Sequence, residues 1–91
     1  MRIPTKLKIG GHTYRVVLKQ NPVADGVACP AYIDDENMEI VIDSDLSQSS
    51  KESSLFHEVL HGINCVLDHT VLDSLAEQLY QVLSDNKLLN D

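Results

Sequence analysis

The hydrophobic pattern of the chain changes its period once, near residue 45, and this change restricts the possible folds more than any other feature. Before that point apolar residues alternate with polar ones, as in strands that have one buried face. After it they recur every three or four residues, as on one face of a helix. A chain of 91 residues forms one domain with a modest core. We therefore predict a single α+β domain over residues 1–91, in which a small sheet precedes a helical hairpin.

The first half of the chain predicts a sheet of three or four strands, antiparallel or mixed. The predicted strands cover residues 6–9, 14–18, 31–33 and 38–42. Between the first two, Gly10 and Gly11 can both adopt the positive φ that a tight hairpin turn requires. Two prolines and an Asp-Gly pair mark residues 21–30 as a loop, and residues 34–37 are polar enough for a turn.

The first predicted helix begins near residue 50, because Ser49 and Glu52 have the spacing of a capping box. It is expected to end near Val66. Its apolar residues recur at helical spacing and are Leu55, Phe56, Val59, Leu60, Ile63, Val66 and Leu67.

A tight turn at Leu67 and Asp68 is expected to lead into the second helix. Asp68 or Thr70 can cap its start, and Asn86 closes it. Its apolar stripe is formed by Val71, Leu72, Leu75, Leu79, Val82 and Leu83.

The first helix carries an H-E-x-x-H motif at residues 57–61. Two imidazoles four residues apart project from one helix face and can bind one cation together. His57 and His61 lie more than about 120° round the helix from the centre of the apolar residues, whereas space-filling core histidines would lie on that apolar face. We therefore predict both as ligands of Zn²⁺, with Glu58 as the general base that takes a proton from water. The competing interpretation is that they are ordinary helix residues.

A third metal ligand is expected from the second helix, because catalytic zinc usually has three protein ligands. If the helices turn at residues 67–68, Asp73 lies level with His61, and His69 lies more than one helical turn beyond the metal. We therefore predict Asp73 as the third ligand. Glu77 could hold the outer nitrogen of His57 or be the third ligand itself, and a plain solvated acid is an equal interpretation. His69 remains an alternative ligand, and Asp73 could instead be an acid of the helix cap.

Several further side chains are weaker candidates. Cys65 follows His61 by four residues and could supply a thiolate, although lone cysteines usually only pack. Cys29 has no spacing partner and is interpreted as incidental. A developing oxyanion could be stabilised by a residue from a set comprising His12, Tyr14, Tyr32 and Tyr80.

The chain resembles small H-E-x-x-H zinc metallopeptidase-like proteins of phages and prophages, related to the ImmA/IrrE group of gluzincin-like zincins. The resembling segments are residues 7–14, 38–43, 57–61 and 75–86, which are spread along the chain and together hold 31 of its 91 residues. The resemblance implies a minimal zincin-like fold in which His57 and His61 bind zinc, Glu58 is the general base and the second helix gives an acidic ligand at Asp73. The corresponding acid in such proteins is commonly a glutamate. The strand at 38–43 would be the sheet edge that binds an extended peptide by strand addition.

Composition excludes several other functions. The net charge is −7 and no basic cluster is present, so nucleic acid and anionic membranes are not expected partners. No apolar run approaches the ~18 residues of a membrane span, and two cysteines are too few for a disulfide framework. We expect a cytoplasmic protein, in the host cell if phage-encoded.

Two functions fit these observations. The leading prediction is a zinc-dependent metallopeptidase that acts on a peptide or protein substrate. The alternative is a non-catalytic, zincin-like metal-binding module that regulates a partner protein, because 91 residues leave little material for substrate walls. A DNA mimic would rest on the acidic charge alone.

Overall fold

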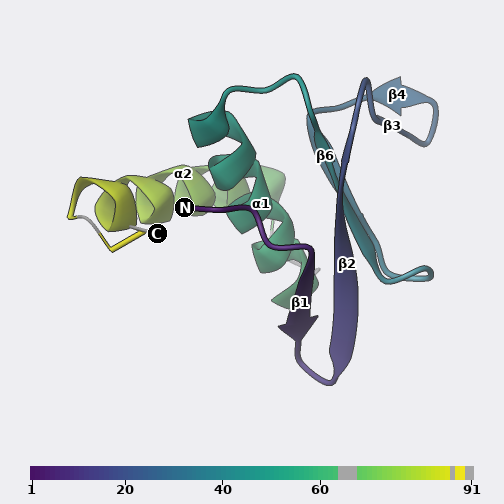
Figure 1. Ribbon diagram of the computed structural model, residues 1–91, viewed down its shortest axis with the longest axis horizontal. Coiled ribbons are helices and arrows are strands. Elements are labelled where there is room, and N and C mark those ends of the chain that lie inside the picture. Colours follow the sequence, from purple (N-terminus) through teal and green to yellow (C-terminus); the bar gives the residue numbers. More distant parts are fainter. Residues whose placement is uncertain (64–67, 87, 90–91) are drawn as a thin grey trace.

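The computed structural model describes residues 1–63, 68–86 and 88–89. The elements follow the chain in the order β1 (Lys6–Ile9), β2 (His12–Lys19), β3 (Val23–Ala24), β4 (Val27–Ala28), β5 (Ala31–Asp34), β6 (Glu39–Asp43), α1 (Gln48–Ile63) and α2 (His69–Asp85). Figure 1 shows both helices on the same side of the main sheet, with α1 next to the strands and α2 farther out. The predicted α+β architecture, with strands first and helices second, is confirmed.

The main sheet is mixed, with strand order β1-β2-β6-β5. β2 pairs with β1 antiparallel and with β6 parallel, and β5 pairs with β6 antiparallel. The strand predicted as the substrate-facing edge is therefore not an edge, because β6 is hydrogen-bonded on both sides. The prediction was wrong because strand order depends on pairing between distant segments, and the exposed edge on that side belongs to β5.

The loop predicted over residues 21–30 contains a second, two-stranded sheet made by β3 and β4. Its turn residues Asp25 and Gly26 have φ values of 52° and 79°. Two successive positive φ angles are those of a type I′ turn, which matches the twist of the two strands that it joins. The strands have two residues each, which is too short for alternation to be visible in the sequence.

The core lies between α1 and the sheet. Ile40 and Ile42 of β6 are fully buried, and they pack with Tyr14, Val16 and Leu55. These five side chains come from β2, β6 and α1, so α1 covers one face of the sheet.

Gly62 brings the end of α1 very close to the strands. A Cβ atom built on it would lie 3.1 Å from Cδ1 of Ile33 and 3.2 Å from Cδ1 of Ile9. The missing side chain thus lets the helix approach β1 and β5 directly after His61.

The start of α1 differs from the predicted capping box. Ser47 is the cap, since its Oγ accepts a hydrogen bond of 3.2 Å from the backbone N–H of Ser50. Glu52 is buried, and its carboxylate lies 3.7 Å from the amino group of Met1 instead of at the helix end. The predicted helix end near Val66 lies outside the described residues.

The ends of α2 follow the prediction. Asp68 is the cap, because its Oδ1 accepts a hydrogen bond of 2.7 Å from the backbone N–H of Thr70, and Asn86 ends the helix. The rest of the predicted turn, at Leu67, lies outside the described residues. No helix within the described part of the chain has the length and hydropathy needed to cross a lipid bilayer.

Only part of the predicted apolar stripe of α2 is buried. Leu72 and Ala76 are buried, whereas the stripe residues exposed by 41–48% are Val71, Leu75, Leu79 and Val82. A helix packed on one neighbour buries the side chains that face this neighbour, and α2 packs on α1. The predicted stripe therefore lies only partly in the contact between the two helices.

Two leucines of α2 give a matched test of this packing. Leu72→Ala should lower the free energy of unfolding by about 2–5 kcal/mol, because it leaves a cavity at a site with 0% exposure. Leu75→Ala, at 47% exposure, should cost less than about 1 kcal/mol. Urea unfolding of both variants measures the difference, and equal losses would contradict the observed orientation of α2.

Candidate metal centre

The two histidines of the H-E-x-x-H motif lie together on α1. The Nε2 atoms of His57 and His61 are 3.1 Å apart, and the centroids of their rings are 4.8 Å apart. The helix causes this proximity, because residues four apart lie one above the other on its surface. The two nitrogens lie within hydrogen-bonding distance, and two imidazoles so placed can bind one cation together when both Nε2 atoms are unprotonated.

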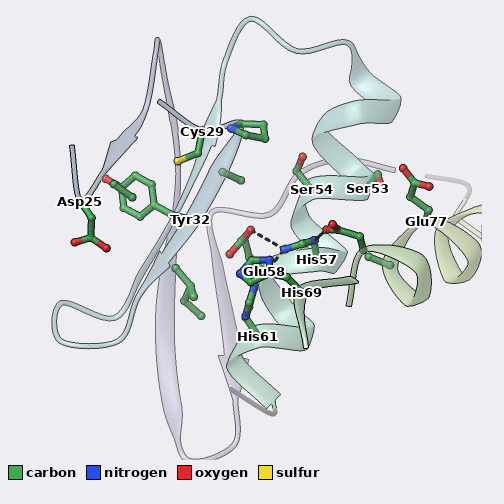
Figure 2. A pocket seen from close by; sticks show the side chains of 16 residues that line it. Asp25, Cys29, Tyr32, Ser53, Ser54, His57, Glu58, His61, His69 and Glu77 are labelled. Carbon is green, nitrogen blue, oxygen red and sulfur yellow. Dashed lines mark hydrogen bonds and ion pairs between the residues drawn. The ribbon is translucent and has the colours of Figure 1, made fainter. Parts of the chain in front are cut away.

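A third imidazole joins them from the first residue of α2. The ring of His69 lies 4.7 Å from that of His61 and 5.7 Å from that of His57, between centroids. One ligand atom from each of the three histidines lies within 4.8 Å of the others. Figure 2 shows the three side chains gathered between α1 and the start of α2.

The predicted position of His69, more than a turn beyond the metal, is therefore wrong. α2 docks farther along α1 than the assumed turn allowed. Its first residue lies beside His61, and Asp73, one turn later, lies beside His57.

Asp73 contacts the Nδ1 side of the His57 ring. Its Oδ1 lies 2.9 Å from Nδ1 of His57, the ring nitrogen that points away from His61. A proton on Nδ1 is then held by the carboxylate, so Nε2 carries a lone pair, which can accept the hydrogen bond from Nε2 of His61 or bind a cation. The structure thus gives Asp73 the role expected for Glu77, and places it outside the group of converging nitrogens. Glu77 is exposed and lines the adjoining cavity.

Glu58 is a buried acid beside this cluster. The residue is 5% exposed, and its Oε2 lies 3.8 Å from Nε2 of His57. Burial, followed by the negative charge of Asp73, raises the pKa of Glu58 to about 7. A group with this pKa can both accept and return a proton near neutral pH.

The two histidines of α1 are held in their neutral forms. Burial is the largest cause that lowers the pKa of His57 and of His61, and the neighbouring imidazoles add to it. The carboxylate of Asp73 acts in the opposite direction on both. Neutral imidazole is the form that binds metal ions, so the environment favours ligation.

A cavity of about 730 Å³ opens in front of the cluster. One wall is formed by β5 and by the residues that precede it, and the other by α1 and α2 (Figure 2). Its lining comprises Ala24, Asp25, Cys29, Pro30, Ala31, Tyr32, Ile33, Ser53, Ser54, His57, Glu58, His61, His69, Asp73, Ala76 and Glu77.

Among the candidates for oxyanion stabilisation, Tyr32 lies in the cavity wall. The hydroxyl of Tyr14 instead donates a hydrogen bond of 2.7 Å to Asp35, and the ring of Tyr80 packs against Phe56. His12 is exposed on β2, outside the lining.

Asp25 and Cys29 also lie in the cavity wall, and sequence reasoning gave neither a role. No local pattern could reveal them, since the fold alone brings this loop to the helices. Cys65 lies outside the described residues.

Comparisons of the chain with models of known protein families, with curated proteins and with solved structures found no match. The resemblance to the phage zincin-like group therefore stays a prediction from the sequence. The geometry of the three histidines and of Glu58 carries the functional argument.

The raised pKa of Glu58 predicts a pH-dependent stability in metal-free protein. Above pH 7 the buried carboxylate is ionised in both states, and the shift from 4.5 to about 7 corresponds to about 3 kcal/mol lost from the folded state. Below pH 4.5 the group is protonated in both states and this loss disappears. Glu58→Gln should therefore be more stable than the wild type at pH 8 by up to about 3 kcal/mol, and equal to it near pH 4.

Urea unfolding with a chelator, across this pH range, measures the effect. Glu36→Gln, at an exposed acid, is the matched control and should keep the wild-type pH profile. Parallel profiles for the wild type and Glu58→Gln would show that Glu58 is not held in a site that disfavours its charge.

Proposed function

We propose that the protein is a zinc-dependent peptidase in which Glu58 is the general base. The observation that carries this proposal is the convergence of three imidazoles beside one buried carboxylate, at the base of an open cavity. Each component has a separate chemical task, and the tasks together make up peptide hydrolysis.

His57, His61 and His69 would hold the zinc ion. Nitrogen ligands at 2.0–2.1 Å in a tetrahedral site lie about 3.3 Å from each other, close to the 3.1 Å between the Nε2 atoms of His57 and His61. His69 is exposed, so its side chain can rotate to close the remaining distance. Three imidazoles in this arrangement suit zinc better than the oxygen-preferring cations. Asp73 orients His57 through Nδ1.

Zinc bound there would supply Lewis acidity, which acidifies a water molecule and polarises a carbonyl group. Glu58 takes the proton from the water and then transfers it to the leaving amine. Its position on the same helix as two ligands fixes the base beside the metal without making it a ligand. A cation at the histidines also lowers the pKa of Glu58, since an opposite charge stabilises the carboxylate.

The edge of β5 offers a binding site for the peptide. β5 pairs with β6 on one side, and residues Ala31, Tyr32 and Ile33 line the cavity. An extended peptide can form backbone hydrogen bonds to the unpaired edge of a strand. A substrate bound there would pass in front of the histidines.

This function fits the minimal zincin-like fold that the sequence resemblance implies. A helix carrying the H-E-x-x-H motif packs under a mixed sheet, and a second helix completes the candidate site. A phage or prophage origin and a cytoplasmic location belong to the same proposal and depend on the resemblance alone.

Zinc content of single variants tests the ligand set. The wild type should bind one zinc per chain, and His69→Ala should weaken binding by more than about a hundredfold because a direct ligand is lost. Asp73→Asn should weaken it by about 10–100-fold, because His57 loses the group that orients it. His12→Ala removes an imidazole outside the cavity and should leave binding unchanged. Zinc retained by His69→Ala but lost in Asp73→Ala would restore Asp73 as the third ligand.

Hydrolysis by a second variant tests the catalytic proposal. Glu58→Gln should keep zinc and lose cleavage by at least about a thousandfold, because an amide cannot take up the proton. Cleavage of a peptide library followed by mass spectrometry measures this, with Glu36→Gln as the control. Equal activity of Glu58→Gln and wild type, or no cleavage by zinc-loaded wild type, would favour the non-catalytic metal-binding module.

A further inference from the structure

Positive and negative side chains occupy different parts of the chain. Five of the seven lysines and arginines lie within residues 2–19, and all fourteen acids lie after residue 19. Between residues 20 and 86 the single lysine or arginine is Lys51. The net charge of −7 is therefore distributed unevenly.

The fold converts this separation along the chain into a separation in space. Most of the early basic residues lie on β1 and β2, which form one side of the sheet. β5 forms the opposite edge and borders the cavity. Most of the early basic side chains are thus on the β1–β2 side of the sheet, whereas the cavity borders β5.

The lining of the cavity is also acidic. Its described lining contains four carboxylates, from Asp25, Glu58, Asp73 and Glu77, and no lysine or arginine. Glu58 and Asp73 belong to the metal centre. Asp25 and Glu77 are exposed and form no ion pair within the described residues. Figure 2 shows them at opposite sides of the cavity, with the three histidines between them.

We propose that this cavity selects peptide segments with a lysine or arginine on each side of the bond placed at the histidines, where Asp25 and Glu77 receive the basic side chains. The inference rests on the proposed function, because it concerns the substrate class of the same site. It adds a preference that neither the metal cluster nor Glu58 requires.

A basic peptide fits the cavity better than a small free cation for two reasons. The strand edge of β5 can bind a peptide backbone, which a free cation lacks. Lysine and arginine also have long apolar stems, which can lie along Ala31 and Ile33 while the charged ends reach the carboxylates.

The expected preference for peptides with lysine or arginine is moderate. An ion pair between exposed groups contributes little, which corresponds to about a two- to fivefold change in affinity for each contact. Two such contacts together should change the affinity about tenfold. Because exposed charges are screened by salt, the preference should disappear near 0.5 M salt, where the Debye length falls to about 4 Å.

Peptide binding to zinc-loaded Glu58→Gln protein tests the inference without turnover. The probes are alanine-rich peptides with a pair of lysines flanking a central bond, the pair being moved along the peptide, and matched sets with glutamine or glutamate. The best lysine peptide should bind about tenfold more tightly than its glutamine counterpart at low salt. Adding Asp25→Asn or Glu77→Gln should weaken lysine-peptide binding about threefold each and leave the glutamine peptide unaffected. Adding Glu36→Gln, which removes the same charge outside the cavity, should change neither.

Equal binding of the three peptide sets would overturn the inference, as would no binding of any set, or a lysine preference that survives loss of both acids. Hydrolysis by wild-type protein is measured separately. A preference that depends on Asp25 and Glu77, without cleavage, would support this inference and contradict the proposed peptidase. Cleavage with no charge preference would do the reverse.

Discussion

The docking of α2 against α1 is the contact on which the candidate site depends. Leu72 and Ala76 are buried on α2, and the depth of this packing sets which residues of the two helices meet. In the observed register His69 lies beside His61, and Asp73 lies beside His57. A shift of one helical turn would separate the third imidazole from the other two. Burial of two apolar side chains therefore decides whether the three histidines form one cluster.

In the metal-free site burial disfavours the charged forms of Glu58, His57 and His61. Glu58 is buried beside neutral imidazoles, and its burial raises its pKa to about 7. The same burial lowers the pKa values of His57 and His61, which keeps their nitrogens available. A bound dication would use those nitrogens and stabilise the carboxylate. One environment thus prepares both the ligands and the base, and this link is the physical basis of the proposed function.

The cavity is formed by a short hairpin, a strand and two helices that pack around the three histidines. The short hairpin of β3 and β4 contributes Ala24 and Asp25, the edge of β5 contributes Tyr32, and the helices form the opposite wall. Gly62 allows α1 to lie close to β1 and β5. The acidic side chains that follow residue 19 give this face its negative charge, while β1 and β2 carry most of the basic ones. Both the walls of the cavity and its acidic side chains therefore come from the part of the chain that follows residue 19.

Features that depend on residues close together in the chain could be predicted from the amino-acid pattern alone. Alternation located β1, β2, β5 and β6, helical periodicity located both helices, and the spacing of the motif identified His57, Glu58 and His61. Such patterns are local because side chains two residues apart share a strand face and those four apart share a helix face. Three other features could not be predicted in this way: β5 and not β6 is the edge, Asp73 contacts His57, and His69 joins the cluster. These outcomes depend on strand order and on the register of two packed helices, which are set by contacts between residues far apart in the chain.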